Sequence, residues 1–287
     1  MTAPAQVVTW RRESPGIWLV TLDRPPANAL GVPILEGLHA AIDAAERAGD
    51  VKVMIVTSAL DGFFAAGADI KHMSSIDAES FMAYGDKMRA VNDRLAGAPW
   101  VSIAAVDGLA LGGGLELAMA CTMRVSGPRG RFGLPEVKLG LIPGAGGTQR
   151  LPRLVGRGRA LDIMLTARQV RADEALAIGL VDRLADGDVV KEALALAAEL
   201  VTSSLPAQLA VVRAVNAAFE LPLDEGLRYE AVLEQGLFAD GDAAEGIRAF
   251  IAKRAPDFAR EITPRLVDDV HAPSRATVKN LRVGDGG

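Results

Sequence analysis

The chain has 287 residues, of which 50% are hydrophobic and only 5% are aromatic. A chain of this length and composition can bury an ample, mainly aliphatic core in one large domain or two small ones. Its net charge of −5 and its pI near 5.4 give no electrostatic reason to expect a nucleic acid or an anionic membrane as a partner.

The cysteine and histidine content argues against a disulfide and against a metal site. Cys121 is the single cysteine, and the three histidines at positions 39, 72 and 271 show no metal-ligand spacing. The N-terminal residues contain no apolar segment of a signal peptide, and no apolar run approaches the roughly 18 residues of a membrane span. We therefore expect a soluble cytoplasmic protein without a metal ion.

The first part of the chain alternates strand patterns with helix patterns. β-rich runs flank the turn Ser14-Pro-Gly16, and Pro33 and Gly49 stand at the two ends of a helical apolar pattern. In chain order we expect a hairpin of residues 7–12 and 17–22, a helix from 33 to 49, a strand at 53–57, a small-residue loop at 61–71 and a helix from about 77 to 95. This alternation predicts an α/β core.

The stretch from 100 to 150 is the most informative part of the sequence. Residues 101–106 predict a buried strand that turns at the glycines 112–114 into a helix. Because these glycines carry no side chain, the turn leaves bare backbone available to a ligand. Glu116 falls in the first turn of that helix among apolar residues, where burial would raise the pKa of a carboxylate. Glu116 is therefore a candidate functional residue.

From Gly156 onward the chain reads as mostly helical. Helical patterns cover residues 160–166, 172–178, 189–203, 206–219, 223–238 and 243–253, with a strand pattern at 180–184 between them. Beyond Phe258 the periodicity is lost, which suits a mobile tail or an arm ordered on a neighbour. We divide the chain into a core of residues 1–200, a helical region 201–258 and a tail 259–287 of unknown role.

Motif spacing argues against nucleotide binding and serine hydrolysis. No Gly-x-Gly-x-x-Gly follows a strand, and neither a P-loop nor a Gly-x-Ser-x-Gly elbow occurs. Two tight turns remain, Gly67-Ala68 and Gly112-Gly113, each expected at the start of a helix, where free N–H groups and the helix dipole favour negative charge. If the two turns converge, they would form an oxyanion hole.

Four segments, in order and with matching spacing, carry a specific resemblance. They are Phe64-Ala-Ala-Gly-Ala-Asp-Ile-Lys71, Gly108-Leu-Ala-Leu-Gly-Gly-Gly-Leu-Glu-Leu-Ala-Met-Ala-Cys121, Phe132-Gly-Leu-Pro-Glu136 and Gly140-Leu-Ile-Pro-Gly-Ala-Gly-Gly-Thr-Gln-Arg-Leu151. With these segments, the sequence from about Val7 to Phe258 resembles the enoyl-CoA hydratase (crotonase) superfamily. The resemblance implies a spiral of ββα units, followed by a C-terminal helical region through which subunits form trimers that pair into hexamers.

The resemblance also implies an activity and the residues that perform it. Family members of this kind add water to a 2-trans-enoyl-CoA thioester to give a 3-hydroxyacyl-CoA, so coenzyme A is part of the substrate and no separate cofactor is needed. By position, the N–H groups of Ala68 and Gly113 would hold the thioester oxygen. Glu116 would be the base on water, Glu136 the acid to C2, and the Gly144 N–H would help to hold the water.

A second set of residues is implied to bind the coenzyme A portion of the substrate. Two of them lie on a C-terminal helix that reaches a coenzyme A site, often that of a neighbouring subunit. The full set is Ala66, Asp69, Ile70, Lys71, Phe250 and Lys253. Two positions depart from the family pattern: Pro26-Ala27 stands where many relatives carry a basic residue, and Thr122 stands where an aspartate is common.

Other functions remain open at this stage. Without the family resemblance, each candidate residue has a simpler interpretation. Glu116 would more often be a structural carboxylate with a charged partner, Glu136 a solvent-exposed loop residue and Lys71 a surface lysine. The same fold also serves 3-enoyl to 2-enoyl isomerases, dehydratases of branched hydroxyacyl thioesters and thioester hydrolases, and some relatives bind RNA or have no catalytic role. Because an isomerase can work with one carboxylate, the pair Glu116 and Glu136 favours hydration. The sequence predicts neither acyl chain length nor pathway.

Overall fold

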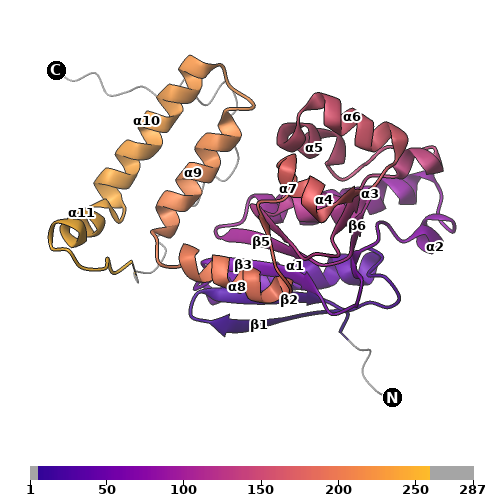
Figure 1. The fold of residues 1–287 in the computed structure, drawn as a ribbon, viewed down its shortest axis with the longest axis horizontal. Helices are drawn as coiled ribbons and strands as arrows, with labels where there is room; N and C mark the ends of the chain where they lie inside the picture. The colour runs from indigo at the N-terminus through magenta and orange to yellow at the C-terminus, as the bar shows by residue number, and fades with distance from the viewer. Residues whose placement is uncertain (1–5, 259–287) are drawn as a thin grey trace.

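The structure is a computed structural model that describes residues 6–258 of the chain. The interval 259–287, set apart above as a tail, lies outside the described residues. Figure 1 shows two sheets with helices around them, and a group of C-terminal helices, α9 to α11, beside this body.

The strands and helices follow the predicted order. The strands are β1 Val8–Ser14, β2 Ile17–Leu22, β3 Val53–Ser58, β4 Phe63–Ala65, β5 Val101–Val106, β6 Leu109–Leu111, β7 Met123–Ser126, β8 Arg131–Gly133, β9 Val170–Arg171 and β10 Arg183–Leu184. The helices are α1 Val32–Ala48, α2 Ile70–Met73, α3 Ala78–Ala96, α4 Gly113–Ala120, the 3-10 helix η1 Glu136–Leu139, α5 Gly147–Val155, α6 Arg157–Thr166, α7 Ala172–Ala177, α8 Val189–Leu200, α9 Leu205–Ala217, α10 Leu223–Asp240 and α11 Ala243–Ile251. The predicted hairpin and the long helices are confirmed. The prediction of a loop at 61–71 is wrong in part, because this segment contains the strand β4 and the single-turn helix α2. The short strands β6, β7, β8 and β9 were not predicted either, since two to four residues are too few to show a strand pattern.

The strands form two sheets that the chain visits in turn. The larger sheet has the order β1-β2-β3-β5-β7-β10, and the smaller has the order β4-β6-β8-β9. Neighbouring strands are parallel except for the pairs β1–β2 and β8–β9. Each step from β3 to β4, from β5 to β6 and from β7 to β8 takes the chain from the larger sheet to the smaller one, and helices follow. The α/β spiral of ββα units is therefore confirmed.

The larger sheet is buried on both faces, which explains the continuous apolar runs in its strands. Side chains alternate between faces along each strand. In β3, Val53 and Ile55 pack against α8 and the start of α9, whereas Met54 and Val56 pack in the main core with α1, α3 and α4. The main core thus lies between the two sheets and these helices.

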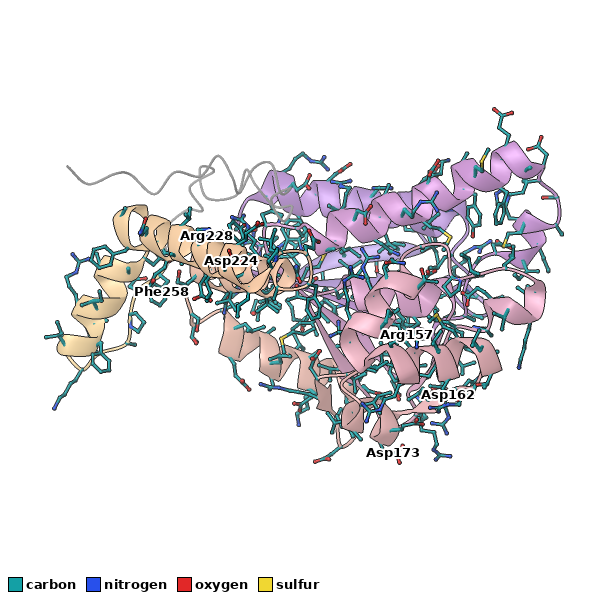
Figure 2. All side chains as sticks on the ribbon, turned by 90° about the horizontal axis from the view of Figure 1, so that it is seen from above. Arg157, Asp162, Asp173, Asp224, Arg228 and Phe258 are labelled. Carbon is teal, nitrogen blue, oxygen red and sulfur yellow. The ribbon has the colours of Figure 1, made fainter. Side chains whose placement is uncertain are left out.

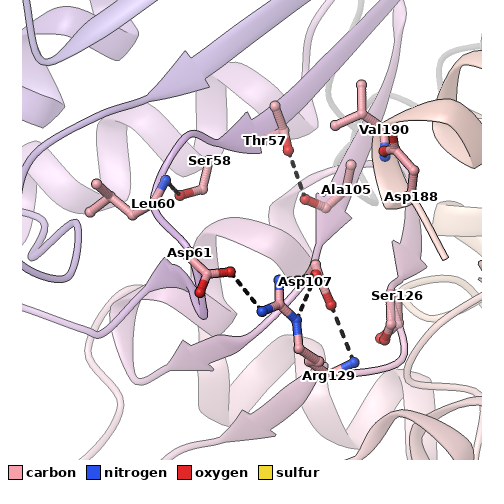
Figure 3. Close-up of polar contacts among 11 residues, drawn as sticks. Thr57, Ser58, Leu60, Asp61, Ala105, Asp107, Ser126, Arg129, Asp188 and Val190 are labelled. Atoms are coloured by element: carbon pink, nitrogen blue, oxygen red, sulfur yellow. Dashed lines mark hydrogen bonds and ion pairs between the residues drawn. The ribbon is translucent and has the colours of Figure 1, made fainter.

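The corners at which the chain changes sheets are joined to one another (Figure 3). Arg129, between β7 and β8, donates to Asp61 at the β3–β4 corner over 2.6 Å and to Asp107 at the β5–β6 corner over 2.6 Å. The Arg129 side chain is 55% exposed, so these ion pairs contribute little stability. Their geometry nevertheless shows that three successive corners stack at one edge of the body.

The C-terminal helices pack less extensively than the rest. Leu205 and Leu209 at the start of α9 belong to the core beneath the larger sheet, but farther along a separate small cluster forms around Ala217, Leu221 and Tyr229. Figure 1 shows α10 and α11 standing away from the sheets. Figure 2 places Asp224 and Arg228 on α10, where their side chains form an exposed ion pair of 3.0 Å. The division at residue 200 stays a prediction.

Within residues 6–258, no single helix is both long and apolar enough to cross a membrane. The bent pair α8 and α9 meets the length and composition requirement only when the two helices are taken together.

The stacked corners generate a stability prediction at Gly108. This residue has φ +110°, and a Cβ there would lie 2.2 Å from the carbonyl carbon of Gly62. We expect Gly108→Ala to lower the free energy of unfolding by about 2 kcal/mol or more, since the new methyl both strains the backbone and pushes two corners apart. Urea-induced unfolding followed by circular dichroism measures this loss.

Gly158→Ala in helix α6 is the matched control. A Cβ at Gly158 meets no atom within 4 Å, and alanine favours a helix over glycine by about 0.5–1 kcal/mol. The control should therefore be neutral or stabilising. Equal unfolding midpoints for the two variants would contradict the close packing of the corners.

Candidate active site

The two predicted glycine turns lie against each other. A Cβ built on Gly112 would lie 3.6 Å from the Cα of Gly67, and a Cβ built on Gly113 would lie 3.8 Å from the nitrogen of Ala68. Gly67 and Gly112 both have positive φ, of +92° and +52°, which bends the chain away from the strands β4 and β6. The structure therefore brings Ala68 and Gly113 together at one end of the smaller sheet.

One detail of the sequence prediction is wrong. The Gly67-Ala68 turn does not begin a helix, because α2 starts at Ile70, is four residues long and is capped by the side chain of Asp69. The second turn does begin one, since Gly112 is the N-cap residue of α4. A dipole contribution is therefore available from α4, whereas the Ala68 side of the site consists of irregular backbone.

Glu116 lies one turn into α4 and is only 2% exposed. Its Oε1 accepts hydrogen bonds from the N–H groups of Ala145, at 2.7 Å, and Gly147, at 2.8 Å. The pKa of Glu116 is raised above its usual range, because burial outweighs the opposing effects of these two donors and of the charges of Arg150 and Arg89. The two N–H donors favour the ionised form of the carboxyl group and offset part of the effect of burial.

Glu136, the first residue of η1, has different surroundings. Its Oε1 faces the Gly112 turn, since a Cβ there would lie 2.7 Å from this oxygen. Its Oε2 is buried and has no hydrogen-bond partner in the part of the chain that the structure describes. Burial, and then the nearby charge of Glu116, raises the pKa of Glu136 to about 7. Glu136 therefore carries a proton over much of the neutral range.

Both carboxyl groups line one cavity of about 190 Å³. Ala68, Gly113 and Gly144 also line it, so the five residues predicted as catalytic meet in one place. The rest of the wall is mainly apolar and comes from α2, α3 and the segment after η1: Met73, Phe81, Met82, Met88, Leu141 and Ile142. The cavity therefore combines an apolar space with two carboxyl groups and the two glycine turns.

Four of the predicted coenzyme A residues lie in the segment 66–71, where two of them are bonded to other parts of the chain and two are exposed. Asp69 is held by an ion pair of 2.7 Å with Arg24, which keeps the pKa of Asp69 low. The N–H of Ala66 donates to the carbonyl of Ala27. Ile70 and Lys71, by contrast, are exposed on α2 and available to a ligand.

Phe250 and Lys253 lie far from those residues within one chain. Phe250 on α11 is 86% exposed, and Lys253 just beyond it is also exposed. Figure 1 shows α11 and α2 at opposite ends of the molecule. The structure therefore does not bring these two residues to the cavity of their own chain.

Residues 6–258 contain no group of three or more histidine, cysteine, aspartate or glutamate side chains that could hold a metal ion.

Comparison with known proteins identifies the family. A sequence model of the family described as Enoyl-CoA hydratase/isomerase matches residues 12–261, which is most of the chain. The chain belongs to the enoyl-CoA hydratase/isomerase family. The resemblance noted from four motifs is thereby confirmed.

Individual members of the enoyl-CoA hydratase/isomerase family agree with this assignment. A probable enoyl-CoA hydratase from Rhizobium meliloti is 44% identical over 247 residues, covering 84% of this chain and 94% of its own. A probable enoyl-CoA hydratase from Bacillus subtilis is 38% identical, covering 85% and 95%. The crystal structure of the enoyl-CoA hydratase from Bacillus anthracis matches with a TM-score of 0.84 at 32% identity, covering 88% and 99%.

Sequence reasoning missed the contribution of α3. Tyr84, Arg89 and Asn92 on this helix all donate to backbone carbonyls around the cavity. Their spacing was visible in the predicted helix 77–95, as polar residues recurring on one face among apolar ones. Nothing in the sequence indicated which carbonyls they would meet.

The surroundings of Glu136 lead to a titration prediction. In infrared difference spectra recorded from about pH 3 to pH 9, we expect the carbonyl stretch of a protonated buried carboxyl group to disappear with a midpoint near pH 7. Glu136→Gln should remove this band and leave the overall spectrum intact. A band that disappears near pH 4.3, the ordinary pKa of glutamate, would contradict the proposed surroundings.

Proposed function

We propose that this enoyl-CoA hydratase adds water to a 2-trans-enoyl-CoA thioester through Glu116 and Glu136 acting as base and acid. The observation that carries the proposal is the meeting of both carboxyl groups with the Ala68 and Gly113 turns in one cavity. The water oxygen bonds to C3 while Glu116 takes a proton from the water. C2 receives a proton from Glu136, and the product is the 3-hydroxyacyl-CoA.

The negative charge that develops during this addition collects on the thioester oxygen. The N–H groups of Ala68 and Gly113 are neutral donors that can hold this oxygen without taking its charge. Removing one such donor typically costs about 10² to 10³ in rate. The convergence of the two glycine turns supports this role.

The roles of the two glutamates follow from their different surroundings. The donors at Ala145 and Gly147 favour a charged Glu116, which can act as a base. The partnerless Oε2 of Glu136 favours a neutral acid that can release a proton. Gly144 lines the same cavity, which supports a role for its N–H in holding the attacking water. Two carboxyl groups with opposite protonation states are what water addition requires.

The family also includes isomerases, so this alternative needs a structural argument. Moving a double bond from C3 to C2 requires a proton to be removed and returned, for which one carboxylate is sufficient. In this chain Glu136 sits beside the Gly112 turn with a raised pKa and lines the same cavity as Glu116. The second, protonated carboxyl group therefore favours hydration.

The C-terminal helices support a proposed assembly. Large apolar side chains are exposed on or beside α9, α10 and α11: Val211, Val215, Phe219, Leu223, Leu227, Phe238, Ile247, Phe250 and Ile251. Many large exposed apolar side chains on neighbouring helices are typical of an interface between proteins. A homotrimer or homohexamer would cover it. It could also bring Phe250 and Lys253 of one subunit to the Ala66–Lys71 segment of another, where coenzyme A would bind.

The carboxyl pair gives a kinetic prediction. Glu116→Gln and Glu136→Gln should each lower kcat for hydration of an enoyl-CoA by about 10² to 10⁴, because the amide keeps the size of the side chain but does not transfer a proton. Affinity for a saturated acyl-CoA should change little. Stopped-flow absorbance of the enoyl thioester and calorimetric titration provide the two measurements.

The double variant provides the internal check. Because the two residues act on one addition, the double loss should be smaller than the product of the single losses. If Glu136→Gln hydrates the substrate at the wild-type rate and only Glu116→Gln loses activity, a one-base reaction such as isomerisation would be favoured. Full activity of both variants would exclude a catalytic role for the pair.

The exposed apolar surface gives a prediction about assembly. Leu223, which is 80% exposed on α10, should be buried in the oligomer, so Leu223→Glu should shift the protein from trimer or hexamer toward monomer in sedimentation velocity. Leu165→Glu is the control, since Leu165 is 68% exposed on α6 in the body. A wild-type protein that is an active monomer would contradict the assembly.

A further inference from the structure

Helix α3 presents polar groups to both halves of the active site. Tyr84 and Asn92 are two helical turns apart and are 4% and 3% exposed, although the face they share is otherwise apolar. Buried polar groups are costly unless they form hydrogen bonds. The partners that these two side chains meet are backbone groups of the catalytic turns.

Tyr84 closes a ring of hydrogen bonds around the first turn. Its Oη accepts from the N–H of Asp69 over 3.0 Å and donates to the carbonyl of Leu30 over 2.6 Å. The N–H of Leu30 in turn donates to the carbonyl of Gly67 over 2.8 Å. That carbonyl belongs to the same peptide group as the N–H of Ala68.

This ring acts directly on one of the two oxyanion donors. A hydrogen bond to the Gly67 carbonyl fixes the plane of the peptide group and polarises it, which strengthens the Ala68 N–H as a donor. The hydroxyl of Tyr84 holds two backbone segments near that peptide: Leu30, which donates to it, and Asp69, which follows Ala68 in the chain. Loss of the hydroxyl would leave a buried carbonyl and a buried N–H without this partner and would release the turn.

Asn92 acts on the other half of the site. Its Nδ2 donates to the carbonyl of Ala145 over 2.9 Å, and Arg89 donates to the carbonyl of Gly144 over 2.9 Å. The Gly144 carbonyl shares its peptide group with the Ala145 N–H, which donates to Glu116. The loop whose N–H groups donate to Glu116 is therefore held by side chains of α3.

We infer that Tyr84 and Asn92 are positioning residues with separate effects: Tyr84 aligns the Ala68 N–H toward the thioester oxygen, and Asn92 aligns the loop that stabilises the carboxylate of Glu116. The inference deepens the proposed hydration and rests on it. It assigns neither side chain a contact with substrate. Each residue acts through one peptide segment, so each should have its own experimental signature.

Tyr84→Phe tests the inferred effect of Tyr84 on the Ala68 N–H. The probe is a saturated acyl-CoA carrying ¹³C at the thioester carbonyl, whose infrared stretch falls when hydrogen bonds polarise the bond. When the ligand binds to the wild type, the frequency of this stretch should fall. When it binds to Tyr84→Phe, the frequency should fall less. The variant should also lower kcat by about 10- to 100-fold, a loss that small misplacements near the reacting atoms produce, with KM nearly unchanged.

Asn92→Leu tests the other half and is the matched comparison. It keeps a similar side-chain size but removes the donor to Ala145, so Glu116 loses well-aligned N–H groups and its pKa rises. The acidic limb of the pH–kcat/KM profile should move to higher pH, while the carbonyl stretch of the bound thioester stays as in wild type. The other charged groups around Glu116 are Glu136 on η1, Arg150 on α5 and Arg89 on α3, and they are unchanged in this variant.

The two readouts together decide the inference. An unchanged stretch and unchanged kcat in Tyr84→Phe would overturn it, as would both variants altering both readouts to the same extent, which would indicate general loosening of α3. A wild type that shows neither hydration nor a carbonyl shift would instead refute the proposed function.

A second substitution covers the case in which Tyr84→Phe does not fold. The sequence contains two tyrosines, so 3-fluorotyrosine incorporated into a Tyr229→Phe background labels position 84 alone. Fluorine changes the donor strength of the hydroxyl while the ring remains in place. A measurable change in the carbonyl stretch relative to unlabelled Tyr229→Phe supports the inference, and an identical stretch overturns it.

Discussion

The contact between the start of helix α4 and the end of strand β4 is the constraint on which the site depends. A Cβ on Gly114 would lie 2.0 Å from the carbonyl oxygen of Ala65, and a Cβ on Gly113 would lie 2.5 Å from the methyl group of Met88. Only residues without a side chain allow the helix to begin this close to the strand. The approach places the Gly112–Gly113 turn against the Gly67–Ala68 turn, and it fixes Glu116 one helical turn farther along. The proposed oxyanion donors and the proposed base are thus positioned by a single packing contact.

The proposed division into base and acid rests on the different backbone surroundings of the two glutamates. Two N–H groups of the 143–147 loop point at Glu116, whereas one oxygen of Glu136 is buried without a partner among the described residues. Each glutamate also raises the cost of charging the other, so the two protons separate rather than share one midpoint. Adding a donor beside Glu136 would make the pair more alike. The missing hydrogen bond is therefore part of how the site works.

The parts of this arrangement that sequence could predict are the local ones. Strand and helix periodicity indicated the α/β core, and the glycines at 112–114 indicated a close turn before Glu116. Partners distant in sequence were not predictable: Tyr84 meets Leu30 across 54 residues, and Asn92 meets Ala145 across 53. Glu136 taken alone resembles a solvated loop acid, since its burial depends on packing against the Gly112 turn. The wrong helix start at Gly67-Ala68 has the same origin, because Asp69 rather than the glycine caps the single turn of α2.

Polar residues on the buried face of α3 follow from what a catalytic backbone donor requires. An N–H group that points at a ligand is free of backbone pairing, as in the first turn of a helix or in irregular backbone. Irregular segments such as the one around Ala68 leave carbonyls that no sheet or helix satisfies. Buried carbonyls without donors cost stability. A rigid helix that supplies side-chain donors, as α3 does at Leu30 and Ala145, satisfies these carbonyls and at the same time fixes the direction of the N–H groups beside them. Apolar residues at positions 84 and 92 could fill the same volume, but they would remove the hydroxyl between Leu30 and Asp69 and would leave Arg150 as the side-chain donor to the Ala145 carbonyl.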